Sequence, residues 1–286
     1  MSITATDDFT LADLIPVLDV AIRSQEVASG KILDDPNDPS SAASLYRDAS
    51  ERMDSICSDS PDSGYWACRS GCSACCHQSV PVTAVEALAI ADLIRDTTSP
   101  QEQKAVVVRL RQNAKRYRSS APFGSSPVEC ALLDERGTCT VHPARPLRGR
   151  GYYSFSATKC AAFRDGSDEE TVPVDPHTSA TMRGVQAGLS GAIRNRGRDG
   201  DYYELHSAVL CALETPDARA RWENSESIFA DCTSPAAAPD DVWIAPQEDG
   251  SVVKLCRTCD GRSKPRLQLV LIGESEVFDQ LQESGD

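Results

Sequence analysis

The sequence has 286 residues, of which 40% are hydrophobic, so the chain is long enough to bury one large core or two smaller ones. Its 43 acidic residues outnumber its 29 basic ones, and the formal net charge of −14 disfavours general binding to nucleic-acid phosphates. No uncharged apolar run approaches the ~18 residues that a membrane span needs. Met1–Thr10 carries no lysine, no arginine and no apolar core, so we expect no secretory signal and a cytoplasmic location.

The first 58 residues are predicted to form a helical segment. Apolar residues recur at helical spacing over 8–22, where Pro16 is expected to kink or split the helix. A polar loop over 34–41 precedes a second predicted helix from Ala42 to about Cys57. The residues expected to face inward on this second helix are Leu45, Tyr46, Met53 and Ile56.

Two capping boxes mark the next helices. Thr83-Ala-Val-Glu86 predicts a helix that runs to about Arg95. Ser99-Pro-Gln-Glu102, with proline at the first helical position, predicts another that runs to about Arg118. Basic residues spread round this second helix, and we interpret them as a solvated face.

A hairpin is predicted over 128–142, with its turn at Asp134-Glu-Arg-Gly137. Further helices are expected over 178–194, 201–214 and 217–229, where glycines of the first of these indicate close helix packing. A linker rich in alanine and proline follows at 234–241. Short strand-like runs then begin at Val242, Ser251 and Leu267.

The twelve cysteines are the unusual feature of this composition. Thiols stay reduced in the cytosol, so we interpret their spacing as metal or redox chemistry before core packing. Four of them lie within nine residues, at Cys68, Cys72, Cys75 and Cys76. Cys72 and Cys75 have the C-x2-C spacing that lets two thiolates reach one tetrahedral ion. On a helix all four would share one face, so a tightly packed helix surface is the alternative.

Adjacent side chains diverge in most backbone conformations, so one ion seldom takes both Cys75 and Cys76. The arrangement favours two metals, a multi-iron cluster, or one ligand beside a separate reactive thiol. A second group follows at Cys130, Cys139 and Cys160, and the predicted hairpin would bring the first two of these together.

These residues resemble the YkgJ-type cysteine-cluster family, whose CxxCxxCC domain is described as zinc- or iron-chelating. The match consists of the first cysteine cluster, the Val-Pro-Val-Thr-x-x-Glu helix start, the two hairpin cysteines and Arg145-Pro-Leu. The resemblance implies that the ligands are Cys68, Cys72, Cys75, Cys76, Cys130 and Cys139. The family has a further cysteine where this sequence has Gly149, and Cys160 is the nearest downstream thiol that can join the site.

Other residues near the motif have two interpretations each. His142 could replace the missing thiol, whereas His77 is interpreted as solvated. Arginines 145, 148, 150 and 164 could offset the negative charge of a thiolate centre, or form a solvated basic loop. Cys256 and Cys259 form a second C-x2-C pair, either half a metal or redox site or two incidental thiols.

The sequence therefore predicts a mostly α fold with a small β-hairpin at the cysteine site and a short β-rich C-terminal extension. We expect an N-terminal helical segment (1–58), a cysteine-cluster metal-binding domain (59–232) and a linker with a small β-rich extension (233–286). The expected function is binding of zinc, iron or an iron–sulfur cluster, with no membrane or nucleic-acid partner. Two alternatives remain: a metal-dependent modifying enzyme, because flagellin lysine methylases have a similar cysteine domain, and a thiol redox sensor.

Overall fold

The computed structural model describes residues 11–119, 128–165, 172–230 and 232, and the backbone of strands at 242–246, 252–258 and 266–272. The chain divides into two compact units, one of residues 16–236 and one of residues 1–15 and 237–286. The larger unit contains the cysteine cluster and is described first.

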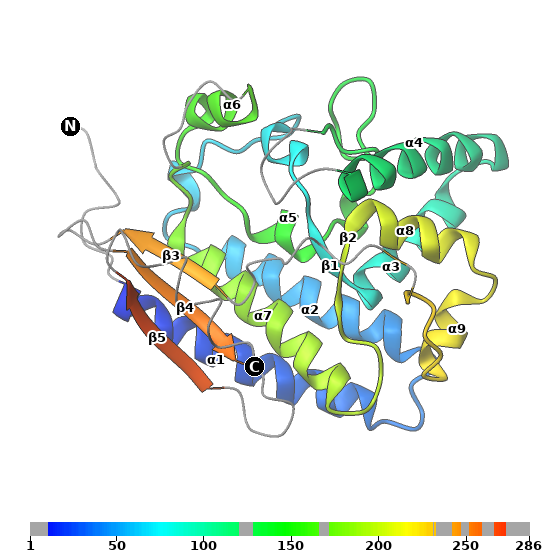
Figure 1. The fold of residues 1–286 in the computed structure, drawn as a ribbon, viewed down its shortest axis with the longest axis horizontal. Coiled ribbons are helices and arrows are strands. Elements are labelled where there is room, and N and C mark those ends of the chain that lie inside the picture. Colours follow the sequence, from blue (N-terminus) through cyan, green and yellow to red (C-terminus); the bar gives the residue numbers. More distant parts are fainter. Residues whose placement is uncertain are drawn as a thin grey trace. The chain divides into compact units, whose positions relative to one another are not determined.

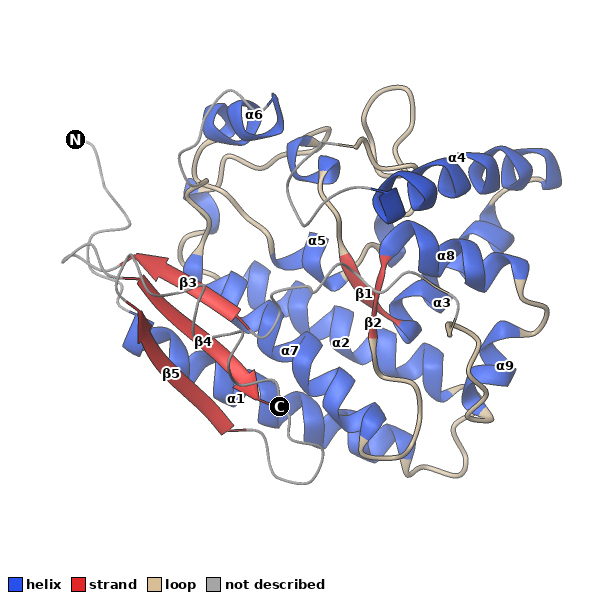
Figure 2. Ribbon diagram, viewed as in Figure 1, coloured by secondary structure: helices blue, strands red, loops and turns tan. Residues whose placement is uncertain are grey.

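The larger unit is mostly helical, as predicted (Figures 1 and 2). Its α-helices, the first of which begins in the other unit, are α1 (Leu11–Leu33), α2 (Ser41–Ser58), α3 (Ala84–Thr97), α4 (Pro100–Ser119), α5 (Leu147–Gly151), α6 (Ala157–Asp165), α7 (Pro176–Arg194), α8 (Leu205–Glu214) and α9 (Ala218–Glu223). Three 3-10 turns accompany them, η1 (Ser63–Tyr65), η2 (Ala74–His77) and η3 (His142–Ala144). Strands β1 (Pro81–Thr83) and β2 (Tyr202–Glu204) form a small antiparallel sheet.

Both predicted capping boxes form. At the start of α3, the Glu86 carboxylate accepts hydrogen bonds from the amide and hydroxyl of Thr83 at 2.8 and 2.9 Å. At the start of α4, Ser99 and Glu102 make the equivalent exchange. Each box satisfies amide groups that have no partner within the helix, which is why these two starts could be located from four residues of sequence.

The core of this unit lies where α2, α3, α7 and α8 pack on one another. Its largest fully buried side chains include Leu45, Met53, Leu88, Met182, Leu189 and Trp222. Three of the four predicted inward residues of α2 are buried; Ile56 is half-exposed, and the neighbouring Cys57 is buried in its place. The hydrophobic face of α2 therefore ends one residue later than its periodicity predicted.

Helices α1 and α7 approach closely through glycine. A β-carbon at Gly184 would lie 2.5 Å from the Ala21 β-carbon, and one at Gly188 would lie 2.4 Å from the Ile22 carbonyl oxygen. Close packing at these glycines was predicted and is confirmed. Pro16 does not split α1, which runs from Leu11 to Leu33, because a proline removes only one hydrogen bond of the helical ladder.

The predicted hairpin over 128–142 is reduced to a turn. Gly137 donates to the Asp134 carbonyl at 2.9 Å and has a φ of +74°, and a single antiparallel bridge joins Leu133 to Cys139. No strand forms over 128–142. The small sheet of this unit instead pairs β1 with β2, so the expected hairpin was wrong in its extent.

The later helices also differ from the predicted ranges. Residues 202–204 form β2, and α8 begins only at Leu205, because the Glu204 side chain caps it by accepting from the Ser207 amide at 2.9 Å. Helix α9 ends at Glu223 rather than near Phe229. The short helices α5 and α6 were not predicted.

The smaller unit contains a three-stranded antiparallel sheet in the order β3-β4-β5. Its strands are β3 (Val242–Pro246), β4 (Val252–Thr258) and β5 (Arg266–Ile272). Cys256 lies on β4, while Cys259 lies outside the described residues. The division into three parts at residues 58 and 232 stays a prediction.

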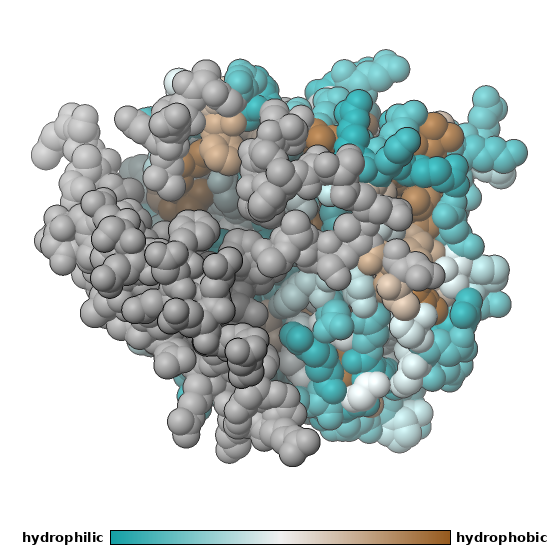
Figure 3. All heavy atoms as spheres, in the orientation of Figure 1, coloured by the Kyte–Doolittle hydropathy of each residue, from teal (hydrophilic) through white to brown (hydrophobic). Residues whose placement is uncertain are grey.

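No helix in the described part of the chain is long and apolar enough to cross a membrane. Hydrophilic side chains dominate the visible surface around α4, with apolar patches between them (Figure 3). Arg111 of this helix is exposed and pairs with Glu214. Arg109 is exposed as well, although it also donates to the Ala131 carbonyl at 3.1 Å, so these basic residues of the helix lie on a solvated face as predicted.

Candidate metal centre

The Cys68–Cys76 segment is a loop that ends in a 3-10 turn, not a helix. Gly71 has a φ of +84°, which favours glycine, and the Cys72 amide donates to the Arg69 carbonyl at 3.0 Å. Cys75 and Cys76 follow within η2. The alternative that the four cysteines are small residues on one packed helix face is therefore wrong. Cys72 is exposed, and the other three are half-buried.

Four thiols from two parts of the chain form what we call the first thiol group: Cys68, Cys72, Cys75 and Cys160. The thiols of Cys68 and Cys160 each interact electrostatically with those of Cys72 and Cys75. Cys160 comes from α6, which packs against η2. The fold thus brings a residue that lies more than eighty positions downstream to the cluster.

Ser154 connects two members of this group. Its amide donates to the Cys68 sulfur at 3.3 Å, and its carbonyl accepts from the Ala67 amide at 2.8 Å. Burial raises the pKa of the Cys68 and Cys160 thiols, and hydrogen bonds from Ser154 oppose that rise. The same residue therefore favours the thiolate form at both sulfurs.

The remaining cysteines of the motif form a second thiol group, which comprises Cys76, Cys130 and Cys139. The Cys130 amide donates to the Cys76 carbonyl at 2.9 Å, and the thiols of Cys130 and Cys139 interact electrostatically. A side-chain hydrogen bond joins Cys76 to Cys75, so the two groups meet at these adjacent residues. This contact and burial raise the pKa of Cys75.

The turn between Cys130 and Cys139 rests on the first cysteine loop. A β-carbon at Gly137 would lie 3.2 Å from the Ser73 hydroxyl, which is in the loop between Cys72 and Cys75. Leu133 and Cys139 pair directly beside this turn. A reduced hairpin is therefore sufficient to place both cysteines near the cluster.

Helix α4 holds the backbone that precedes the turn. Three of its side chains, spaced four residues apart, donate to backbone carbonyls of residues 128–131. These bonds join Arg109 to Ala131 at 3.1 Å, Asn113 to Glu129 at 2.7 Å and Tyr117 to Val128 at 3.4 Å. On the amide side, Val128 and Cys130 donate to His77 and Cys76. The segment that carries Cys130 is thus fixed along its length.

The four arginines of the Arg-Pro-Leu region have different surroundings. The charge of Arg145 lowers the pKa of both Cys75 and Cys139, so it lies near both thiol groups. Arg164 pairs with Asp165 at 2.8 Å and interacts with Cys72. Arg148 is turned into the protein, where burial lowers its pKa and it donates to Gln186 at 3.1 Å.

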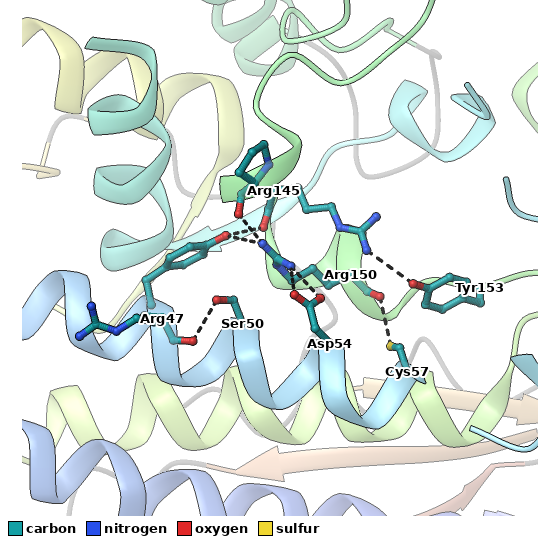
Figure 4. A network of polar contacts seen from close by, with 9 residues as sticks. Arg47, Ser50, Asp54, Cys57, Arg145, Arg150 and Tyr153 are labelled. Carbon is teal, nitrogen blue, oxygen red and sulfur yellow. Dashed lines mark hydrogen bonds and ion pairs between the residues drawn. The ribbon is translucent and has the colours of Figure 1, made fainter. Parts of the chain in front are cut away.

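Arg150 anchors this region to α2 (Figure 4). Its guanidinium donates to both carboxylate oxygens of Asp54 at 2.7 and 2.6 Å, to the Tyr46 hydroxyl at 3.2 Å and to the Pro143 carbonyl at 2.5 Å. Figure 4 also shows the Cys57 thiol donating to the Arg150 carbonyl, at 3.5 Å. The side chain of Arg150 therefore has a structural role, since its two terminal nitrogens donate to α2 and the preceding turn.

Glu86 fixes the same turn from the other side. This buried carboxylate caps α3 and also accepts from the Leu147 amide at 2.8 Å and from Gln186 at 3.1 Å. The capping box that starts α3 and the Arg-Pro-Leu turn thus share one carboxylate.

Position 149 lies between Arg148 and Arg150. Gly149 is exposed, and a β-carbon there would meet no atom within 4 Å. A cysteine therefore fits at this position without steric conflict. His142 is exposed, and its pKa is lowered by burial and by Arg145 and Arg150, while His77 Nδ1 lies 3.0 Å from the Ser73 carbonyl.

Three further cysteines lie apart from both thiol groups. Each thiol donates to a backbone carbonyl, from Cys57 to Arg150 at 3.5 Å, from Cys211 to Ile228 at 2.9 Å and from Cys232 to Ser207 at 3.7 Å. Buried or half-buried thiols with such partners pack as small weakly polar residues. Their isolation in the sequence matches this role.

Sequence reasoning missed His206. Its ring is 1% exposed, its Nδ1 lies 2.7 Å from Glu204, and its Nε2 accepts from the Ala131 amide at 3.2 Å. A side-chain hydrogen bond also joins it to Cys130. The available signal was the Glu-x-His pair at the start of α8, but nothing in the sequence places that helix beside residue 130.

The donor set fits zinc or iron, because both bind grouped thiolates in tetrahedral sites. Within the described ranges, no three histidine, cysteine or acidic side chains are arranged to hold an ion as they stand. Thiol side chains rotate about one bond, so ligation requires rotamer changes around a backbone that is already fixed by the contacts above.

Comparison with known proteins finds one similarity, in the region of the cysteines. Residues 67–168 match the model of the CxxCxxCC family, which carries the description "Putative zinc- or iron-chelating domain". This part of the chain is similar to a CxxCxxCC domain. The matched range includes all seven predicted ligands and the Arg-Pro-Leu turn, and it supports metal binding in general terms. No curated protein and no solved structure matched the chain.

Proposed function

We propose that the CxxCxxCC domain binds zinc or iron through two adjoining sets of thiolates. The first thiol group supplies Cys68, Cys72, Cys75 and Cys160, and the second supplies Cys76, Cys130 and Cys139. The observation that carries this proposal is the packing of α6, which holds Cys160, against η2, which holds Cys75 and Cys76. The protein would act in the cytoplasm, where such thiols remain reduced.

The surroundings of the thiols support a negatively charged centre. A divalent ion held by four thiolates carries net negative charge, which nearby cations and amide groups stabilise. Arg145 interacts with thiols of both groups, and the Ser154 amide donates to Cys68. A metal–thiolate complex needs such contacts around its ligands. Seven thiols that bind no metal would not need them.

The decisive experiment is metal analysis with a visible absorption spectrum on the full chain purified without oxygen. Stoichiometric zinc without colour would identify a zinc site, and brown charge-transfer absorption would identify iron–sulfur. We expect Cys72→Ser and Cys160→Ser each to lower metal content. The matched control is Cys211→Ser, which removes a thiol outside both groups and should leave metal content unchanged.

A thiol redox sensor is the second candidate, and one contact favours it. The side chains of Cys75 and Cys76 are hydrogen-bonded to each other, so oxidation could join them. Metal-free protein that loses two free thiols reversibly on mild oxidation would support this alternative. The modifying-enzyme alternative stays a prediction from the family resemblance.

A further inference from the structure

We infer that His206 is a positioning residue for the metal centre: held by Glu204, it preorganises the Cys130 thiol of the second group. This inference rests on the proposed function, because it assigns a role within the same site. It adds a residue from α8, thirty-eight positions beyond the end of the matched family domain.

Contacts within the protein hold the His206 imidazole in place. His206 and Glu204 are both 1% exposed, and the His206 Nδ1 lies 2.7 Å from one carboxylate oxygen. The other oxygen accepts from the Ser207 amide at 2.9 Å, so the carboxylate is itself held by the start of α8. The Tyr117 ring stacks on the imidazole with ring centres 5.5 Å apart and planes 8° apart.

The opposite edge of the ring faces the second thiol group. The Ala131 amide donates to Nε2 at 3.2 Å, while Nδ1 faces Glu204. The Cys130 thiol also bonds to this ring. His206 therefore contacts the side chain of Cys130 and the backbone of the next residue.

These contacts favour a positioning role over direct ligation. An imidazole that binds a metal must present a free lone pair, and at His206 the Ala131 amide already occupies Nε2. The backbone around Cys130 cannot move readily to release that bond. The Cys130 amide donates to the Cys76 carbonyl, and the carbonyls of the residues on either side accept hydrogen bonds from α4. A carboxylate–histidine pair that orients a ligand is a recurrent outer-shell device in metal sites.

Preorganisation is the physical benefit. A thiol that is free to rotate loses rotamer entropy when it binds a metal, whereas one already held by a buried ring loses less. Outer-shell partners of this kind typically change metal affinity by about 10–100-fold. His206 should therefore affect how tightly the second thiol group binds, without changing the number of thiolates bound.

The test uses the full chain and cobalt(II) alone, because cobalt reports thiolate ligation through its absorption. We expect His206→Gln to weaken cobalt binding by about 10–100-fold in competition with a chelator. At saturation, the sulfur-to-cobalt charge-transfer intensity should equal that of the parent protein. In the cobalt-bound chain, Cys130 should be alkylated faster than in the parent, while Cys68 keeps its rate. The matched control is His177→Gln, an exposed histidine at the start of α7.

Glu204→Gln guards against a misfolded variant, because it keeps the side-chain volume and an oxygen that can face Nδ1. We expect it to change affinity and Cys130 alkylation in the same direction but less. Unchanged affinity and alkylation in both folded variants would overturn the inference. A cobalt spectrum that shows loss of a nitrogen ligand in His206→Gln would also overturn it, because His206 would then be a ligand. Parent protein that gives no thiolate–cobalt band would instead contradict the proposed function.

Discussion

Single residues of the Arg-Pro-Leu region have distinct roles although they are close in sequence. Arg145 acts on the thiols: the pKa of Cys75 is raised by its contact with Cys76 and by burial, that of Cys139 is raised by burial, and the Arg145 charge opposes both rises. Arg150 points the other way, and its buried guanidinium contacts Asp54 and Tyr46. An arginine near a cysteine cluster is therefore not by itself part of the metal centre, and the two kinds of role can be separated by measurement.

We expect Arg150→Lys to destabilise the protein by about 2 kcal/mol, because an ammonium group cannot make the forked contact with Asp54 and still reach the Pro143 carbonyl. The midpoint of urea unfolding measures this change. Arg23→Lys is the control, since the Arg23–Asp19 pair is exposed and we expect it to change stability little. Equal midpoints for the two variants would show that the contacts of Arg150 contribute nothing to the free energy of unfolding.

Gly149→Cys tests the position where the family resemblance leads us to expect a thiol. The β-carbon fits in open space, so the variant should fold normally. If position 149 belongs to the ligand shell, the variant should bind metal more tightly or hold more of it than the parent. Metal content and resistance to chelators measure this. No change in either would place residue 149 outside the shell, and the resemblance would not extend to this position.

At the scale of elements, the site depends on how helices are joined rather than on the helices alone. Helix α4 supports the Cys130 segment, α6 supplies Cys160, and α5 follows the turn that Glu86 fixes. Helices α1 and α7, which carry none of these cysteines, pack on each other through glycine. A substitution that disturbs the packing of α1 on α7 should therefore lower the free energy of unfolding more than it alters the thiol groups.

Gly188→Ala should destabilise the protein by about 1–3 kcal/mol, because the added methyl group would collide with the backbone of α1. Thermal or urea unfolding measures the loss. Gly149→Ala is the matched control: it also replaces a helical glycine, but it meets open space. There we expect unchanged stability or a gain of up to about 1 kcal/mol. A Gly188→Ala variant as stable as this control would contradict the close approach of the two helices.

At the scale of the whole molecule, metal binding and folding should be coupled. The thiol groups draw on segments from Cys68 to Cys160, and apart from η2 and α6 the cysteines of both groups lie in loops and turns. A metal that ties such segments together contributes directly to folding free energy. Metal binding should therefore raise the free energy of unfolding of the larger unit as a whole.

We expect removal of metal by a strong chelator to unfold the cysteine-cluster domain. Structural zinc sites contribute on the order of 10–16 kcal/mol in small peptides, against a total stability of about 5–15 kcal/mol for a domain. Calorimetry and helical circular dichroism, with and without chelator, measure the effect. Restored unfolding temperature on adding zinc or iron is the control. A melting transition that chelation leaves unchanged would contradict the coupling.

The β-rich extension should be separable from the metal centre. A chain ending near Cys232 should keep its metal content and its helical signal, because β3, β4 and β5 pair only with one another among the described strands. Metal analysis and circular dichroism of the truncated chain test this. Loss of metal on truncation would show that Cys256 or Cys259 completes the site.

Local features of this protein could be predicted from its sequence. The capping boxes at Thr83 and Ser99, and the close packing at Gly184, depend on residues within a turn or on a side chain that is absent. The cysteine spacing likewise indicated metal chemistry, and the family match supports it. These inferences succeed because hydrogen bonds and ligand spacing within a few residues are set by backbone geometry alone.

Tertiary structure alone decided how the cysteines are grouped and what surrounds them. Nothing near Cys130 in sequence indicates that α4 holds its backbone or that His206 lies beside its thiol. The reduction of the hairpin to a turn follows from the same cause, because α4 and η2 take up the hydrogen bonds that a partner strand would have made. Contacts between distant segments depend on the packing of the whole core, which no short stretch of sequence determines.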